Sequence, residues 1–291
     1  MIQSTAVGSG DGGPGARRRG RATAFAAAFA AAVWILTGCA STHKVDKITQ
    51  ELLSTPKETL FEKGKGLIEK KKYDLGRKYL TFIFETYPND PLGRQSLLMV
   101  ADSFFQQRTT TGYTEARFRY RDYLNRYPGA PQRDYARYQF AVCYDREHEK
   151  PDRDQTSTRE AIEQYRVLQK EFPNSSHNAT ANARIHALID LLAEHEFGVG
   201  YFYMRKGSPG AALARFTSME ERFPEYGARD KLFFYEGEVL GRLGRHEEAS
   251  RYYARLIEEY PKSEFLKKAK EKVGKAPPSA SASVDTRAKS E

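Results

Sequence analysis

Cysteine is scarce in this chain, which excludes a small fold held together by disulfide bonds. Among 291 residues there are only two cysteines, Cys39 and Cys143, whereas a disulfide framework needs several pairs. Cys143 lies in the apolar segment Phe140–Tyr144. We interpret it as a small buried residue, because a free cysteine packs like a small hydrophobe.

The motifs of common enzymes are also missing. We find no Ser/His/Asp or Cys/His arrangement, no glycine-rich phosphate loop and no HExxH pattern. His186, Asp190 and Glu194 recur at helical spacing on one face, so they could hold a metal ion. A polar stripe facing solvent explains them more simply. The sequence thus predicts no catalytic residue, no metal and no cofactor, apart from a covalent lipid on Cys39.

Acidic and basic residues are mixed along the chain, and the formal net charge is only +9. The segment Lys267–Lys272 is typical, with a glutamate among lysines. No motif of a nucleic-acid-binding domain accompanies the basic residues. We therefore expect solvated helix faces and no nucleic-acid partner.

The N-terminal segment has the features of an export signal. Four arginines, at 17–19 and 21, precede an uncharged, alanine-rich stretch from Ala22 to Gly38. This stretch is shorter than the roughly 20 residues needed to span a bilayer. It ends in Leu36–Cys39, whose sequence Leu-Thr-Gly-Cys resembles a bacterial lipobox. We predict a lipoprotein signal peptide over residues 1–38, the alternative being a plain transmembrane anchor.

The lipobox resemblance implies a protein attached to a membrane by lipid on Cys39. Several acyl chains on one residue give stable attachment without a membrane-spanning helix. Lipoproteins kept at the inner membrane usually carry aspartate after the cysteine, but Ala40 stands there, which favours the outer membrane. Residues 39–54 are mostly polar, and we predict that they form a flexible tether.

Five copies of one spacing predict the fold. In each copy a residue with little or no side chain precedes a proline by 12 positions, and an aromatic residue stands directly before the proline. The pairs are Gly76 with Pro88, Ala116 with Pro128, Ala161 with Pro173, Ala212 with Pro224, and Ala249 with Pro261. A second small residue lies upstream in every copy: Gly64, Ala101, Ala141, Gly200 and Gly237. Small residues let two helices approach closely and proline ends a helix, so each copy predicts a helix pair.

This pattern is typical of the tetratricopeptide repeat, a helix-turn-helix of about 34 residues. We predict an all-α solenoid over residues 55–273, opened by a capping box at Thr55–Glu58. The expected helix pairs span 56–88, 91–128, 131–173, 176–224 and 227–261, and a final helix at 263–273 caps the stack. Residues 274–291 are rich in Pro, Ala and Ser and predict a disordered tail.

One helix of the fourth pair is predicted to be unusually long. We interpret Ser176–Lys206 as one helix, with Gly207 as its stop. Its length would be roughly 46 Å at 1.5 Å per residue. We expect it to project from the solenoid and to expose more surface than its own pair buries.

The register of the repeats places the first helix of each pair on the inner face. One position is apolar or aromatic in every repeat: Phe61, Leu98, Tyr138, Phe197 and Phe234. These residues could simply pack repeat against repeat, or they could line a groove that binds extended or helical peptides. The second interpretation predicts a peptide groove of Phe61, Lys65, Arg94, Gln95, Leu98, Phe105, Tyr135 and Tyr138.

In these features the chain resembles the BamD (YfiO) family of lipoproteins of the outer-membrane β-barrel assembly machinery. The resemblance covers about residues 50–262. It is carried by five repeats directly after the tether and by the insertion Asp152–Asp154 in the third pair. It is also carried by the turn Phe172–Ser175 and by the long helix ending in Glu196–Gly207.

The resemblance implies a non-catalytic scaffold, anchored by lipid at the periplasmic face of the outer membrane, that acts in the assembly of β-barrel proteins. The implied partners are a BamA-like barrel protein, other lipoproteins of the machinery, and the C-terminal segments of unfolded outer-membrane proteins. The long helix offers candidate contacts for the barrel protein: Arg184, Asp190, Glu194, Glu196 and Arg205. Another repeat lipoprotein, such as a pilotin or an envelope-coordination factor, remains an alternative, and a periplasmic enzyme has no support in the sequence.

Overall fold

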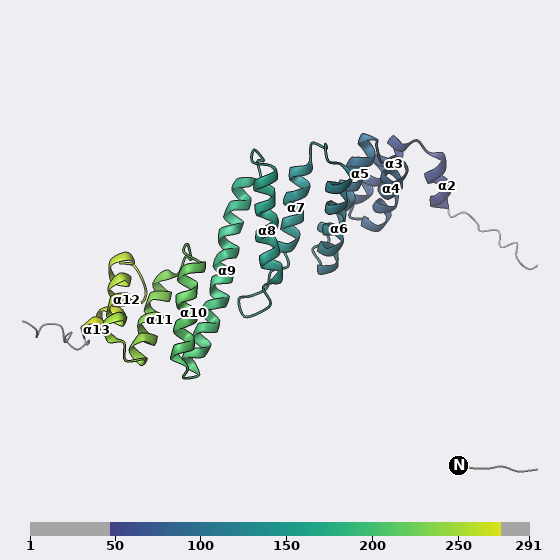
Figure 1. Cartoon of the computed structure of the whole chain (residues 1–291). Coiled ribbons are helices and arrows are strands. Elements are labelled where there is room, and N and C mark those ends of the chain that lie inside the picture. Colours follow the sequence, from purple (N-terminus) through teal and green to yellow (C-terminus); the bar gives the residue numbers. More distant parts are fainter. Residues whose placement is uncertain (1–46, 275–291) are drawn as a thin grey trace, which may run out of the picture. The chain divides into compact units, whose positions relative to one another are not determined.

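The computed structural model describes residues 47–274, which form twelve α-helices, α2 to α13, and no strand (Figure 1). The predicted signal peptide, Cys39 and the predicted tail beyond Gly274 lie outside the described residues. Within the described range, no helix combines the length and the apolar character that crossing a membrane requires.

α2 (Lys47–Ser54) belongs mainly to a separate unit that ends at Leu53. None of its residues is buried, and Leu53 keeps 73% of its surface exposed. Residues 47–54, which the sequence predicts as part of the tether, form a helix, and Ile48 and Leu52 recur in it at helical spacing. The predicted tether is therefore helical over its last part.

The other helices form five pairs, and each pair also packs against the next. The pairs are α3 (Lys57–Glu69) with α4 (Tyr73–Thr86), α5 (Pro91–Phe105) with α6 (Thr110–Arg126), α7 (Arg133–Asp145) with α8 (Thr156–Glu171), α9 (Asn178–Arg205) with α10 (Pro209–Arg222), and α11 (Arg229–Arg242) with α12 (His246–Glu259). α13 (Leu266–Val273) packs on α12. The predicted all-α solenoid of five tetratricopeptide-like pairs with a capping helix is confirmed.

The small residues of the repeat allow the close approach that the sequence predicts. A Cβ atom added to Gly200 would lie 2.4 Å from Cε1 of Phe216, and one added to Gly237 would lie 2.5 Å from Cε1 of Tyr253. Both rings are buried. Glycine is therefore required at these crossings, because a buried aromatic ring cannot move aside in a close-packed core.

We expect Gly237→Val to lower the free energy of unfolding by about 1 to 3 kcal/mol, the usual cost of overpacking a core. Gly241→Ala is the matched control on the same helix, since a Cβ atom there meets nothing within 4 Å. It should raise stability by about 0.5 to 1 kcal/mol, because alanine favours a helix over glycine. Urea denaturation followed by circular dichroism measures both changes. Equal midpoints for Gly237→Val and the parent would contradict the close-packing explanation.

The N-terminus of α3 differs from the predicted capping box. Pro56 is the N-cap residue, and no side chain caps the helix there. The Pro56 carbonyl accepts a hydrogen bond from Leu60 N at 3.1 Å, so the helix begins one residue later than predicted. Thr55 therefore lies one residue before the N-cap.

The long helix α9 has 28 residues, but it does not project as predicted. Ala181, Ile185 and Leu188 of its first half pack into a core cluster with α7 and α8. Its second half, which includes Ala193 and Phe197, packs into another cluster with α10 and α11. Both halves are therefore used for packing, and α9 joins two parts of the core.

Candidate partner-binding surfaces

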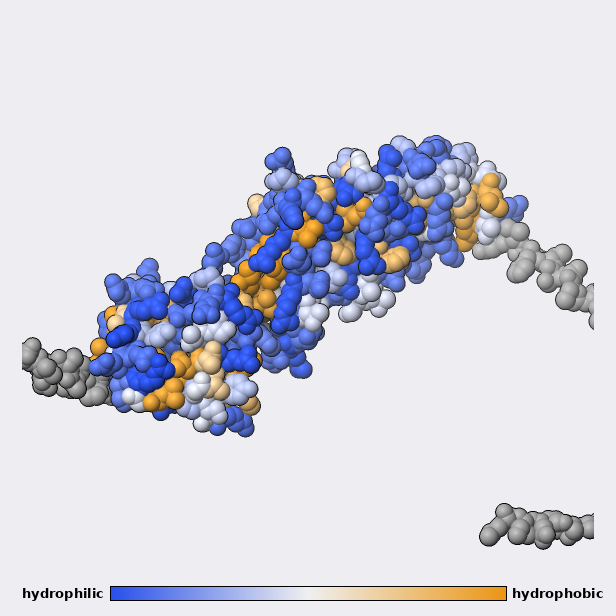
Figure 2. Space-filling view, in the orientation of Figure 1, coloured by the Kyte–Doolittle hydropathy of each residue, from blue (hydrophilic) through white to orange (hydrophobic). Residues whose placement is uncertain are grey.

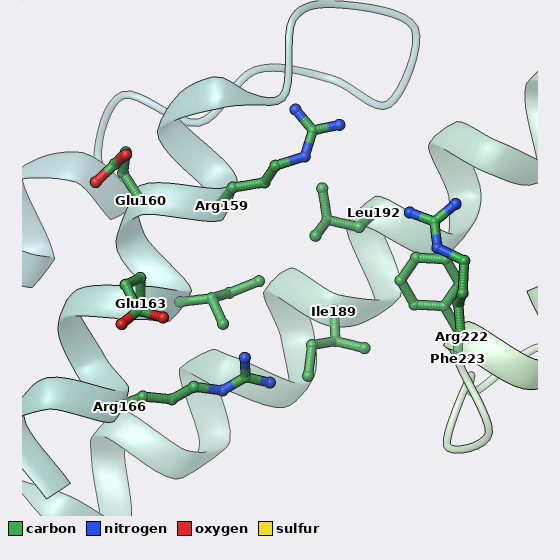
Figure 3. A pocket seen from close by; sticks show the side chains of 9 residues that line it. Arg159, Glu160, Glu163, Arg166, Ile189, Leu192, Arg222 and Phe223 are labelled. Atoms are coloured by element: carbon green, nitrogen blue, oxygen red, sulfur yellow. The ribbon is translucent and has the colours of Figure 1, made fainter. Parts of the chain in front are cut away.

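An open hollow of about 440 Å³ lies between α8, α9 and the end of α10, and we call it the α8–α10 hollow (Figure 3). Its apolar lining consists of Ile162 from α8, Ile189 and Leu192 from α9, and Phe223, the C-cap residue of α10. Ile189 and Leu192 are only half-buried. Figure 2 shows apolar surface over α8 and α9, so this region of the core remains open to solvent.

Arginines surround this apolar lining. Arg159 and Arg166 extend from α8 toward α9, and Arg222 lies on the opposite side (Figure 3). Arg222 Nη1 donates a hydrogen bond to Glu196 Oε1 at 3.0 Å. Within residues 47–274, the side chains of Arg159 and Arg166 make no hydrogen bond or ion pair. Although Glu160 and Glu163 also line the hollow, the two unpaired guanidinium groups remain available to an acidic partner.

The opening lies at the middle of α9, where the helix changes from packing on one core cluster to packing on the other. Ile189 and Leu192 contact both core clusters, the one that α9 forms with α7 and α8 and the one that it forms with α10 and α11. Neither cluster covers them fully. The arginines and the apolar pair of this hollow were not among the predicted contacts. The segment Leu188–Leu192, which is apolar except for Asp190, signals a helix that is apolar on more than one face.

Arg184, a predicted partner contact, is engaged inside the chain. Its Nε and Nη2 atoms donate to the two carboxylate oxygens of Asp145 at 2.8 and 2.7 Å. Tyr165 also donates its hydroxyl hydrogen to Asp145, at 2.8 Å. Burial opposes ionisation of Asp145, but these hydrogen bonds outweigh it and lower the pKa of the carboxyl group. The ion pair joins α7 to α9.

Asp190 and Glu194 hold the turn that follows α10. Asp190 Oδ1 accepts a hydrogen bond from Gly227 N at 2.9 Å. Both carboxylate oxygens of Glu194 accept from Lys231 Nζ at 2.7 Å, and Tyr226 donates its hydroxyl hydrogen to the same carboxylate. In the described part of the chain, no group of His, Cys, Asp and Glu residues could hold a metal ion. The carboxylates of Asp190 and Glu194 are thus engaged by groups of the same chain.

The remaining two predicted contacts differ from each other. Glu196 accepts from Arg222 and also lies 3.6 Å from Arg215, which places it in an ion-pair cluster between α9 and α10. Arg205 is exposed at the end of α9 and, within the described range, has no side-chain partner. Four of the five residues predicted to contact a barrel protein thus make contacts within the fold, because their helix packs along its whole length.

The apolar stripe of the predicted groove is mostly covered. Phe61, Leu98, Phe197 and Phe234 are buried, and only Tyr138 is half-buried. Four of the five positions are therefore part of the core. Tyr138 lines a second hollow, between α7, α8 and α9.

Tyr135 and Phe105 of the predicted groove make contacts within the fold. Tyr135 donates to Asp102 Oδ1 at 3.0 Å, and Tyr120 donates to the same oxygen at 2.6 Å. Burial raises the pKa of Asp102, although both hydrogen bonds act in the opposite direction. Phe105 packs its ring against Tyr113, with 5.4 Å between ring centroids.

The polar residues of the predicted groove remain accessible. Gln95 is exposed and Lys65 is half-buried. Arg94 Nη1 makes a long hydrogen bond of 3.4 Å to the Asn89 carbonyl. Cys143, by contrast, is fully buried as the sequence predicts, and burial raises the pKa of its thiol.

A family model described as YfiO, outer membrane lipoprotein, matches residues 54–253. The chain belongs to the YfiO family. The matched range begins at the end of α2 and ends in α12, so it contains most of the solenoid and both hollows.

Several proteins are similar in sequence along most of their length. The outer membrane protein assembly factor BamD of Caulobacter vibrioides is 27% identical over 226 residues, which cover 78% of this chain and 72% of that protein. BamD of Rickettsia prowazekii is 28% identical, covering 79% of this chain and 89% of that protein. BamD of Neisseria meningitidis serogroup A is 26% identical, covering 79% of this chain and 89% of that protein. Among solved structures, the TPR2AB domain of yeast Sti1 is 15% identical, covers 76% of this YfiO-family chain and 82% of that chain, and has a TM-score of 0.41.

Proposed function

We propose that this protein acts in the assembly of outer-membrane β-barrel proteins, as a non-catalytic scaffold attached by lipid to the periplasmic face of the outer membrane. The family match over residues 54–253 carries this proposal, together with the BamD proteins of similar sequence. The lipobox-like Leu36–Cys39 supports the attachment. Other lipoproteins of the same machinery are further expected partners.

The α8–α10 hollow is the surface that we assign to a barrel-forming, BamA-like partner. It offers an apolar lining of Ile162, Ile189 and Leu192 beside the unpaired Arg159 and Arg166. An interface core needs apolar surface that can be desolvated, and arginine is enriched among residues that contribute most to binding. A partner segment that carries both apolar and acidic side chains would satisfy both parts of the hollow.

Arg159→Glu combined with Arg166→Glu is expected to weaken co-purification of the barrel-forming partner by more than about tenfold, because like charges at an interface cost several kcal/mol. The measurement is affinity purification of the tagged full chain from detergent-solubilised membranes. Lys78→Glu with Arg121→Glu is the matched control, since it makes the same change of charge at exposed positions of α4 and α6. Equal recovery of the partner with both double variants would exclude the hollow as the docking surface.

The same purification separates the two functional classes. Recovery of a barrel-forming protein with the parent chain supports the assembly function. Recovery of a secretion pore or a pilus component would support the alternative, a pilotin or an envelope-coordination factor with the same repeat fold.

We also assign to the inner face of the repeats the binding of C-terminal segments of unfolded outer-membrane proteins. Helical repeats present extended concave surfaces that suit peptides. The half-buried Tyr138 and the accessible Lys65 and Gln95 support this assignment. The buried Phe61 and Leu98 contribute to it only through packing of the repeats.

A further inference from the structure

Helix α2 carries its large apolar side chains on one face. At about 100° per residue, Ile48, Leu52 and Leu53 fall within an arc of roughly 140°, and the charged Lys47 and Glu51 lie on the opposite side. Ile48 and Leu52 are half-buried, whereas Leu53 exposes a larger fraction of its surface than any other large apolar side chain within residues 47–274. Figure 2 shows hydrophobic surface over α2. Since no residue of this helix is buried, its apolar face is not part of a core.

This helix lies close in sequence to the predicted site of lipid attachment. Cys39 and Lys47 are eight positions apart, and a chain extends by at most about 3.6 Å per residue. Lipid on Cys39 would therefore keep the start of α2 within roughly 29 Å of the point where the chain meets the bilayer. The family match begins at residue 54, so it does not include most of this helix.

The charges around α2 favour an apolar partner over a charged one. Residues 44–54 contain two lysines, one aspartate and one glutamate, so they carry no net charge. Helices that bind an anionic surface by electrostatic attraction carry an excess of lysine and arginine. Because α2 lacks this excess, burial of its apolar face must supply its attachment. The apolar boundary of the bilayer is within reach of the lipid-attached helix at all times, whereas a protein partner would have to be encountered.

We propose that α2 lies in the interfacial region of the bilayer to which the protein is attached, with Ile48, Leu52 and Leu53 buried between the headgroups and the acyl chains. This proposal rests on the proposed lipid attachment at Cys39. Three apolar side chains bind a membrane only weakly on their own, but the lipid holds α2 at a high local concentration beside the surface, so that a weak contact is occupied. Lys57, where α3 begins, follows Ser54 by three positions. A membrane-bound α2 therefore keeps the start of the first helix pair beside the bilayer.

The test is tryptophan fluorescence of the lipid-attached protein in phosphatidylcholine vesicles. The single tryptophan of the sequence, Trp34, lies in the predicted signal peptide, so a chain that begins at Cys39 contains none. Leu53→Trp places one probe on the apolar face of α2, and its emission should shift to shorter wavelength. Brominated lipids should quench it, more strongly with bromine near the headgroups than near the chain ends, because an interfacial helix is buried by only about 5 to 10 Å. Leu243→Trp, at another exposed leucine, is the matched control and should show neither change.

A second variant separates the apolar face from the lipid. Ile48→Gln with Leu52→Gln, added to Leu53→Trp, should return the emission to that of an exposed tryptophan. The protein should still sediment with the vesicles, because Cys39 keeps its lipid. Circular dichroism should show an intact solenoid, since neither substituted residue is buried.

Each contrary result would overturn the proposal in a different way. If Leu53→Trp sediments with vesicles but emits as an exposed tryptophan, α2 does not lie in the bilayer, while the lipid attachment stands. A shifted emission that brominated lipids do not quench and that grows with protein concentration would show that a second copy of the chain covers the face. A shift that requires anionic lipid and disappears in high salt would show that headgroup charge holds the helix. If the protein does not sediment with vesicles at all, the proposed lipid attachment fails as well.

Discussion

Cys39→Ser is expected to move the protein from the membrane fraction to the soluble periplasmic fraction almost completely. Serine lacks the sulfur that would carry the lipid, and the acyl chains supply the attachment at about 0.8 kcal/mol per buried CH₂ group. None of the helices within residues 47–274 offers a membrane span in their place. Ultracentrifugation followed by immunoblotting measures the distribution, provided that the signal is still exported and cleaved.

Cys143→Ala is the matched control, since Cys143 is fully buried in α7 and has no part in the attachment. That variant should stay in the membrane fraction. Mass spectrometry of the parent protein should show an acylated N-terminal peptide that begins at Cys39. An intact segment of residues 1–38 on the membrane-bound protein would instead support the transmembrane anchor.

Stability of the C-terminal repeats is expected to fall as pH rises, because α11 carries a buried carboxyl group. Glu236 is fully buried, and within the described residues neither of its carboxylate oxygens has a hydrogen-bond partner. Burial raises its pKa to about 9, and the nearby Glu220 acts in the same direction. Arg229 and Arg255 lower it in part, but both also face Glu220, which attracts them.

The direction follows from the protons bound in each state. In the unfolded chain Glu236 ionises near its usual pKa of about 4.3, whereas in the folded chain it keeps its proton up to about pH 9. The folded state therefore binds more protons between these values, and the free energy of unfolding decreases across this window by at most about 1.4 kcal/mol per pH unit. Below a pH of about 4.3, Glu236 is protonated in both states and does not lower the free energy of unfolding.

Glu236→Gln removes the ionisation and keeps the shape of the side chain, so it should flatten this decrease. We expect the variant to gain stability over the parent as pH rises from 5 to 8.5, measured by urea denaturation at each pH. Glu221→Gln, at an exposed position on α10, is the control and should follow the parent. Parallel curves for Glu236→Gln and the parent would show that Glu236 is ionised in the folded protein.

The helix pairs followed from the sequence because their signals are local. A proline after an aromatic residue, as at Pro128 and Pro224, ends a helix wherever the rest of the chain lies. The small residues were equally informative, since Gly200 and Gly237 each lie against an aromatic ring of the second helix of their pair. Element type and order were therefore predictable, and so was Gly207, which has a φ of 76° at the end of α9.

The candidate sites were less predictable, because they depend on which side chains are already paired by contacts within the fold. Arg184 and Arg166 are both arginines on helices with polar faces, but Arg184 pairs with Asp145, which lies 39 residues away in sequence. Arg166 finds no such partner within residues 47–274. The sequence shows the charges, but it does not show the distances that pair them.

The sequence by itself determined the repeat architecture, the presence of one long helix in the fourth pair, the lipobox-like signal and the resemblance that the family match confirmed. Each of these depends on residue types at fixed spacing along one chain. The tertiary structure decided that α9 packs along its whole length instead of projecting, and that most of the predicted inner stripe is buried. It also decided which arginines remain unpaired beside the α8–α10 hollow. These features arise from contacts between helices far apart in sequence, whose relative positions are set by the packing of the whole core.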